Sequence, residues 1–302
     1  MKFSQRVPVV LCMLLVFMSM LPAFVVMFPG AAAAAYSQVI TFGADLTAAQ
    51  RSMLASEFGV NLAQADRPVT EITNAEERKY LSGLVPEETL GTRAISSAMV
   101  EMLPAGQGIR VTSRNITWVT DDMYANALVT AGVRDAGVTV AAPFPVSGTA
   151  ALTGIFKAVE VATGKSLGER PKKAASRELV ETGSLGEEIG RDKAVQFIVL
   201  VKQQVIAERT ANPERIRQIV INVAGDLNLN LNNRQVEEVT GLMQEIRGLN
   251  LRAEDLTGQL QSYKDKLEAY TVKQEEVKGW IQRVLDILDR LIQQIRAALL
   301  GE

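Results

Sequence analysis

The amino-acid sequence predicts an α+β fold, in which a mixed sheet is layered with helices, followed by an all-α C-terminal region with a long heptad-patterned helix. Over residues 36–165, short apolar strand patterns alternate with capped helical patterns, as they do in layered domains. Residues 191–302 contain only helical patterns. Within them, apolar residues recur at alternating steps of four and three from Leu249 to Ala298, which is typical of a helix packed along a seam.

The first part of the predicted domain consists of two strand–helix pairs, with strands over residues 38–42 and 68–72. Each following helix begins with the spacing of a capping box, in which two side chains bond the first free backbone N–H groups. The two boxes are Thr47-Ala-Ala-Gln50 and Thr73-Asn-Ala-Glu76. The helices are expected to end at Gly59 and Gly83, because glycine commonly terminates a helix.

The second part is predicted to contain a β-hairpin, because strand patterns over residues 94–103 and 109–117 flank a turn-forming segment, residues 104–108. Thr120 then caps a helix over residues 121–131, and a buried strand follows over residues 138–142. We expect Pro143-Phe144-Pro145 to turn the chain into a helix that begins at Ser147 or Thr149 and reaches Ala162.

The remaining chain is predicted to be helical after a non-helical connection. Residues 166–190 are rich in Gly, Lys and Glu and contain Pro171, so we expect a linker or surface excursion. Helices are expected over residues 192–208, 213–224 and 235–247. The predicted parts are therefore a leader over 1–35, an α/β domain over 36–165, the connection over 166–190 and a helical region over 191–302.

Two features of the C-terminal stripe bear on its partner. Its early flanking positions are lysines, namely Lys264, Lys266, Lys273 and Lys278. A parallel homodimer would bring these charges together, so that assembly is disfavoured. The later flanks are apolar and include Trp280, Leu285, Ile287 and Ile292. This wider face favours an intramolecular bundle, with a partner helix or a membrane surface as alternatives.

The N-terminus has the pattern of a secretory leader. Lys2 and Arg6 precede an almost wholly apolar run over residues 7–27, and residues 31–35 are all alanine, so we expect a signal peptide cleaved before Tyr36. The run also approaches the ~20 residues that span a bilayer, which leaves an N-terminal membrane anchor as the alternative. In both cases the body is expected to be extracellular or on the outer face of the cytoplasmic membrane.

Composition excludes several classes of chemistry. The chain has no histidine, so Ser-His-Asp and Cys-His catalysis and histidine zinc sites are excluded. The only cysteine, Cys12, lies in the leader, so the exported part has no disulfide of its own. The formal net charge is −2, without a long run of one sign, so we expect no nucleic-acid partner. No cofactor is expected either.

Two segments are candidate binding sites. Ser147, Gly148 and Thr149 follow a predicted strand and precede a helix, so their backbone N–H groups are candidates for holding an anion. Ordinary helix capping is the alternative, because the Gly-Lys-Ser/Thr ending of a P-loop is absent. Four residues have EF-hand-like calcium spacing: Asp226, Asn228, Asn230 and Glu237. Leu231 stands where the sharp turn of such a loop needs glycine, so an Asn-capped helix is the alternative.

Enzymatic chemistry is the second functional alternative. Acidic doublets such as Glu76-Glu77 and Asp121-Asp122 offer paired carboxylates, but their position in first helical turns suits the helix dipole. Ser147 with Lys157 or Lys165 would offer a serine–lysine pair. A hydrolase-type site would use such groups around residues 115–120 and 143–149.

Long segments of the body resemble a known family. They are Glu76–Tyr80, Gly91–Ser97, Asn115–Thr120, Met123–Gly132, Ala141–Gly154 and Gly183–Gly190. These segments look like the YpuA-like exported proteins of spore-forming Gram-positive bacteria, whose shared region is domain of unknown function 1002. The resemblance covers most of the chain between the leader and the terminal helix. It implies an envelope or extracellular setting and carries over no catalytic or binding residues.

The main functional expectation is a non-catalytic binding or scaffold protein of the cell envelope, whose partner is an unknown envelope protein or a membrane surface. The alternatives are the hydrolase-type enzyme and a membrane-surface protein attached through residues 285–300. An open polar cleft around residues 115–120 and 143–149 would favour the enzyme, whereas a filled core would favour the scaffold.

Overall fold

The computed structural model describes residues 36–64, 67–249, 251, 261, 263–265, 267–268 and 278–300. Residues 1–35, for which a signal peptide or membrane anchor is predicted, lie outside the described residues, as do most positions of the heptad stripe before Lys278. The strands are β1 (Gln38–Gly43), β2 (Val69–Ile72), β3 (Ser97–Met102), β4 (Ile109–Ile116) and β5 (Ala136–Val146).

The first helices are α1 (Ala48–Glu57), the 3-10 turn η2 (Leu62–Gln64), α2 (Asn74–Leu81), α3 (Glu87–Leu90), α4 (Asp121–Thr130) and α5 (Thr149–Thr163). The later helices are α6 (Glu169–Ile189), α7 (Arg191–Ala207), α8 (Pro213–Asp226), α9 (Asn233–Arg247) and α11 (Lys278–Leu300). The capping boxes predicted at Thr47 and Thr73 are present at the starts of α1 and α2. Strands and helices both occur in the described residues, so the predicted α+β class is confirmed.

The five strands form one mixed sheet in the order β2-β1-β3-β5-β4. β1 and β2 are parallel, β4 and β5 are parallel, and β3 runs antiparallel to both β1 and β5. The predicted β-hairpin is wrong, because β5 lies between β3 and β4. β5 carries the buried Val138 and Val140 and is paired on both edges, while β4 reaches it through the crossover helix α4, as parallel strands require.

β5 is also longer than predicted. Instead of turning at residues 143–145, the strand continues to Val146, which pairs with Ile116 of β4. A register shift at Asn115 makes this possible: its φ is 58°, and its Nδ2 donates to Ala142 O at 2.8 Å. The extra residue lets β4 bend so that it stays beside the extended strand.

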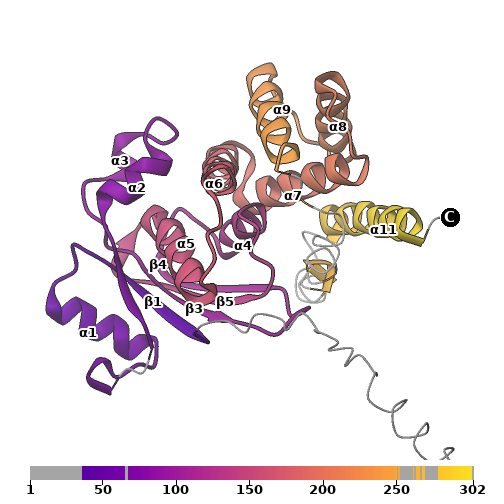
Figure 1. Cartoon of the computed structure of the whole chain (residues 1–302). Helices are drawn as coiled ribbons and strands as arrows, with labels where there is room; N and C mark the ends of the chain where they lie inside the picture. The colour runs from indigo at the N-terminus through magenta and orange to yellow at the C-terminus, as the bar shows by residue number, and fades with distance from the viewer. Residues whose placement is uncertain are drawn as a thin grey trace, which may run out of the picture. The chain divides into compact units, whose positions relative to one another are not determined.

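Helices cover both faces of the sheet (Figure 1). α4 and α5 pack on one face through a core that includes Tyr124, Leu128 and Phe156. α1 lies on the other face (Figure 1), where Leu54 and Phe58 pack against strand residues such as Phe42. Each helix thereby buries one apolar stripe, as expected for a layered domain.

The prediction of a linker over residues 166–190 is wrong, because residues 169–189 form α6, which packs against α4, α7 and α9. The helix was missed because its buried face is largely made of polar or small residues. These are Lys172, Ala174, Ala175, Ser176, Glu178, Thr182, Gly183 and Gly186, beside Leu179, Val180 and Leu185. Such a face lacks the apolar periodicity by which a buried helix is recognised.

A buried ion pair joins α6 to the rest of the core. Lys202 Nζ of α7 lies 2.9 Å from Glu178 Oε1, and the two side chains are 0% and 1% exposed. Asn126 and Thr130 of α4 each donate to the Glu178 carboxylate, at 2.9 and 2.5 Å. Lys202 also donates to the main-chain oxygen of Asn126 and to Thr130 Oγ1, both at 3.1 Å. Both buried charges are therefore paired and hydrogen-bonded, as stable burial requires.

The apolar core of the helical region is built mainly from α7, α8, α9 and α11, and Val129 of α4 and Leu185 of α6 join it. Pro213 begins α8 with Asn212 as its cap, and a capping box at Asn232 begins α9. The buried side chains of α11 are Ile281, Val284, Leu285, Ile287, Leu288, Leu291, Ile292 and Ile295. This face is wider than a two-position seam and fits a helix packed into a globular core.

Candidate functional site

The predicted anion-binding residues lie where β5 passes into α5. Gly148 is the residue before the helix and adopts φ 95°, a conformation that favours glycine. Thr149 is buried, and its hydroxyl lies 3.2 Å from that of Ser147. The buried Tyr124 hydroxyl donates to the Gly148 carbonyl oxygen. Strand, turn and helix are thus held together around one helix N-terminus.

A carboxyl group of the chain itself reaches this turn. Glu77 of α2 is 1% exposed, and its side chain hydrogen-bonds to Thr149. Asn74 Nδ2 donates to Glu77 Oε2 at 3.3 Å, whereas Oε1 has no hydrogen-bond partner among the described residues. Burial raises the pKa of the Glu77 carboxyl from 4.5 to about 7, although the bonds from Thr149 and Asn74 oppose the shift.

Sequence reasoning missed Glu77 because it treated the doublet Glu76-Glu77 as one feature of a first helical turn. The structure separates the two residues. Glu76 completes the capping box with Thr73, while Glu77 turns inward. The neighbouring Tyr124 hydroxyl has its pKa raised well above 10.0, by burial first and then by the charges of Asp121 and Glu77. An external anion at residues 147–149 would therefore have to share this turn with a buried acid.

The two loops named for the enzyme alternative do meet. Thr117 N donates to Val146 O at 2.9 Å, and Val119 N donates to Ser147 O at 3.1 Å. Of the two lysines suggested for a serine–lysine pair, Lys157 is engaged elsewhere, because its Nζ donates to Glu71 O at 2.7 Å and to Glu76 Oε1 at 2.8 Å. The loops thus meet through backbone hydrogen bonds, and the Lys157 ammonium is held by α2 and β2.

The predicted calcium ligands lie at the junction of α8 and α9. Asp226 ends α8 and lies 3.6 Å from Arg290 Nη2 of α11, while Glu237 of α9 accepts from Arg217 Nε at 2.9 Å. Asn228 adopts φ 52°, and Asn230 is exposed beside it. Both carboxylates are therefore engaged by arginines. Within the described residues, no group of three or more Asp, Glu, His or Cys side chains could hold a metal ion.

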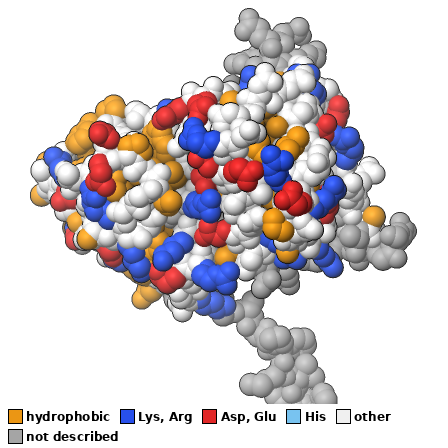
Figure 2. All heavy atoms as spheres, turned by 90° about the horizontal axis from the view of Figure 1, so that it is seen from above, with side chains coloured by type: hydrophobic (Ala, Val, Ile, Leu, Met, Phe, Trp, Pro, Cys, Tyr) orange, Lys and Arg blue, Asp and Glu red, His pale blue; other side chains and the backbone are white. Residues whose placement is uncertain are grey.

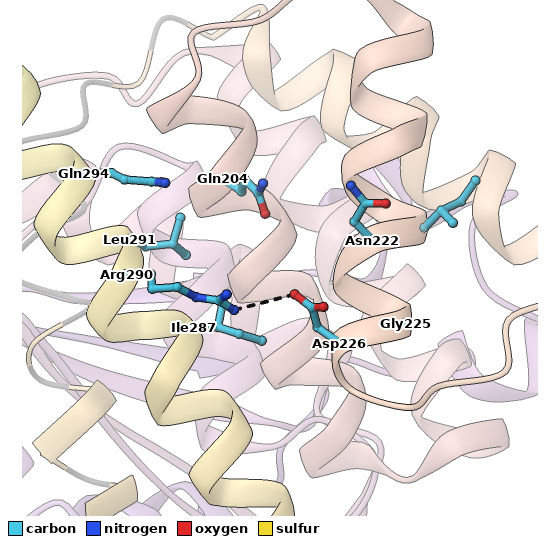
Figure 3. Close-up of a pocket in the computed structure, with 9 residues that line it drawn as sticks. Gln204, Asn222, Gly225, Asp226, Ile287, Arg290, Leu291 and Gln294 are labelled. Carbon is cyan, nitrogen blue, oxygen red and sulfur yellow. Dashed lines mark ion pairs between the residues drawn. The ribbon is translucent and has the colours of Figure 1, made fainter.

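A pocket of about 560 Å³ lies between α7, α8 and α11 (Figure 3). α11 forms one wall and α8 the opposite wall, with Gln204 of α7 between them (Figure 3). The Arg290–Asp226 ion pair bridges the two walls. The lining residues are Gln204, Ile221, Asn222, Gly225, Asp226, Ile287, Arg290, Leu291 and Gln294. Sequence analysis singled out only Asp226 of these residues, as a calcium ligand, and missed the pocket because its lining comes from three helices that no shared motif connects.

The lining offers hydrogen-bonding amides and one pair of charges. Among the described residues that line the pocket, only Asp226 and Arg290 carry charge, and they pair with each other. The other polar groups are the amides of Gln204, Asn222 and Gln294, which orient a ligand by hydrogen bonds but do not exchange protons near neutral pH. Over the face in Figure 2, basic and acidic side chains are interspersed.

The mixed sheet, its covering helices and the attached helical core define the chain as an α+β protein with a pocket in its helical part. The chain belongs to the family described as protein of unknown function (DUF1002), whose model matches residues 42–263. It is similar to "Uncharacterized protein YpuA" of Bacillus subtilis (strain 168), with 37% identity over 249 residues, covering 82% of this chain and 84% of that protein. No solved structure matches it significantly. The family resemblance noted in the sequence is confirmed.

Proposed function

We propose that this chain is an exported, non-catalytic binding protein of the cell envelope, and that the pocket between α7, α8 and α11 is its binding site. The observation that carries the proposal is the lining of this pocket: three side-chain amides, an apolar base and one internally paired couple of charges. Pockets of a few hundred Å³ with a few polar groups are typical of ligand sites.

Export is supported by the N-terminal pattern of Lys2, Arg6 and the following apolar run, and by the absence of cysteine after Cys12. A chain without thiols tolerates an oxidising compartment, because it cannot form unwanted disulfides.

The binding reading has more support than its two alternatives. The enzyme would need an accessible acid beside a nucleophile at residues 115–120 and 143–149. There, Thr149 and the adjacent Glu77 are buried, and the hydroxyl of the partly exposed Ser147 is hydrogen-bonded with that of Thr149. The membrane-surface reading would need the apolar face of α11, which packs inside the helical core. Among the described helices, none is long and apolar enough to cross a membrane.

The proposal is tested in intact cells of a Gram-positive host. A photo-crosslinking amino acid is placed at Asn222 in the pocket wall and, as the matched control, at the exposed Lys173 of α6. We expect an adduct with an envelope component from position 222 and not from position 173. Protease added to the intact cells should degrade the full-length tagged chain. Equal labelling from both positions, or a chain shielded from protease until lysis, would contradict the proposal.

A further inference from the structure

We propose that the pocket between α7, α8 and α11 binds a short, uncharged peptide segment. In this assignment the side-chain amides bond peptide groups of the ligand, and the apolar base receives one of its aliphatic side chains. The proposal rests on the binding function above and specifies the class of ligand.

The amides of the pocket offer the hydrogen bonds that a peptide group needs. Gln204 Nε2 donates to Glu208 at 3.1 Å, which leaves the Gln204 carbonyl oxygen available to accept. Asn222 Oδ1 accepts from Gln218 at 2.7 Å, which leaves its NH₂ group available to donate. Gln294 is exposed on the opposite wall and can do both. A peptide group has one N–H donor and one C=O acceptor, so its chemistry matches this set.

The apolar part of the pocket is shaped for an aliphatic side chain. Ile287 and Leu291 of α11 form a buried apolar base, while Ile221 of α8 is 38% exposed at the pocket. Because Ile287 and Leu291 are already buried, the apolar surface that a ligand would remove from water is chiefly that of Ile221, and this removal is favourable. The pocket thus combines hydrogen-bonding amides with apolar contact, the two requirements of a peptide bound in a groove.

The charges of the pocket favour an uncharged ligand. Arg290 Nη2 lies 3.6 Å from Asp226 Oδ2, so the charges of the described lining residues cancel. A phosphate or carboxylate attracted by Arg290 would also face Asp226, and an amine attracted by Asp226 would face Arg290. An ionic ligand would therefore gain little binding energy, because its attraction to one residue of the pair is offset by repulsion from the other.

Two other ligand classes fit less well. None of the described residues that line the pocket is aromatic, whereas an oligosaccharide usually stacks its ring faces on aromatic side chains. An acyl chain would cover the amides of Gln204, Asn222 and Gln294 without bonding them, and unsatisfied polar groups are costly to bury. A peptide can satisfy both the amides and the apolar base.

Gly225 allows the pocket to be filled without disturbing the fold. It lies in α8 and lines the pocket, and a Cβ added there would meet no atom within 4 Å. Gly225→Leu should therefore place its side chain in open space, and leucine favours a helix more than glycine does. Gly279 of α11 is exposed, has equally open surroundings and does not line the pocket. Gly279→Leu is thus a matched control.

The test measures ligand binding to the exported form of the protein, purified from the cells that express it. The probe is a pool of acetylated, amidated octapeptides built only from Ala, Val, Leu, Ser and Thr, compared with pools that also contain Lys or Glu. An N-acetylglucosamine pentamer and phosphatidylglycerol vesicles are the other probes. Equilibrium dialysis with mass-spectrometric detection gives the affinities, and circular dichroism checks that both variants are folded.

We expect saturable binding of uncharged peptides that Gly225→Leu weakens about tenfold or more, a change equal to losing one or two good contacts. Gly279→Leu should bind as the unsubstituted protein does, and charged pools should bind more weakly. If the pentamer or the vesicles bind, and Gly225→Leu abolishes this binding while Gly279→Leu does not, the peptide assignment is overturned but the binding function remains. Absence of any binding that depends on Gly225 would overturn both.

Discussion

The buried ion pair between Glu178 and Lys202 makes a sharp prediction about stability. Lys202→Met replaces the ammonium by a side chain of similar length and leaves the Glu178 carboxylate, 1% exposed, without its counter-ion. Removing one partner of a buried pair typically costs about 3–5 kcal/mol of the free energy of unfolding. We expect about 3 kcal/mol, the lower end of that range, because Asn126 and Thr130 still donate to the carboxylate.

The pair should also be energetically coupled. Glu178→Gln alone leaves the Lys202 charge buried, and we again expect a loss of about 3 kcal/mol. The double variant contains no buried charge, so its loss should be about 1–2 kcal/mol instead of the sum of the two single losses. Lys173→Met, at an exposed position of the same helix as Glu178, is the control and should change stability by less than about 0.5 kcal/mol.

Urea unfolding followed by circular dichroism, on the chain without its first 35 residues, gives the free energy of unfolding of the unsubstituted chain, the two single variants, the double variant and the control. Both the midpoint and the slope should be compared, because a change in slope would signal departure from two-state unfolding. Additive losses in the double variant would refute the reasoning, since they would mean that the two charges do not stabilise each other in the folded chain.

Three further predictions concern single positions. The pKa of the Glu77 carboxyl is raised to about 7 in the folded chain, from an ordinary 4.5. As the pH rises, this carboxyl therefore ionises first in the unfolded chain, so the free energy of unfolding should fall by up to about 3 kcal/mol between pH 4.5 and pH 7. We expect Glu77→Gln to reduce the difference in the free energy of unfolding between pH 5 and pH 8, measured by urea unfolding. A difference equal to that of the unsubstituted chain would contradict this prediction. Gly183→Ala would place a Cβ 2.4 Å from the Trp118 ring, so it should destabilise by about 1–3 kcal/mol and shift the tryptophan emission, whereas Gly225→Ala should do neither. Asn212→Ala removes the cap of α8 and should lower the free energy of unfolding by about 1 kcal/mol; no loss would argue against the cap.

Local chemistry explains why several elements were predicted correctly. The capping boxes at Thr47 and Thr73, and the N-terminal proline of α8, are contacts between residues close in sequence. They can be read from spacing alone, because both partners lie within one helical turn. The glycines after α1 and α2 adopt positive φ, at Gly59 and Gly83, for the same local reason.

The errors arose where distant residues compete for one position. Residues 104–108 have the composition of a hairpin turn, yet β5 takes the place between β3 and β4 because it can pair on both edges. α6 was hidden because its buried face includes Lys172, Glu178 and Ser176. Whether such polar residues are buried depends on partners more than twenty residues away, such as Lys202 for Glu178.

The candidate site shows the same division. Its nine lining residues come from three helices whose sequence positions extend from Gln204 to Gln294, and no spacing rule connects them. By itself, the sequence determined the α+β class, most helix starts and the family, because these depend on local patterns and on long shared segments. Only the tertiary structure decided the strand order, the burial of Glu77 and the pocket, because each depends on side chains that packing alone brings together.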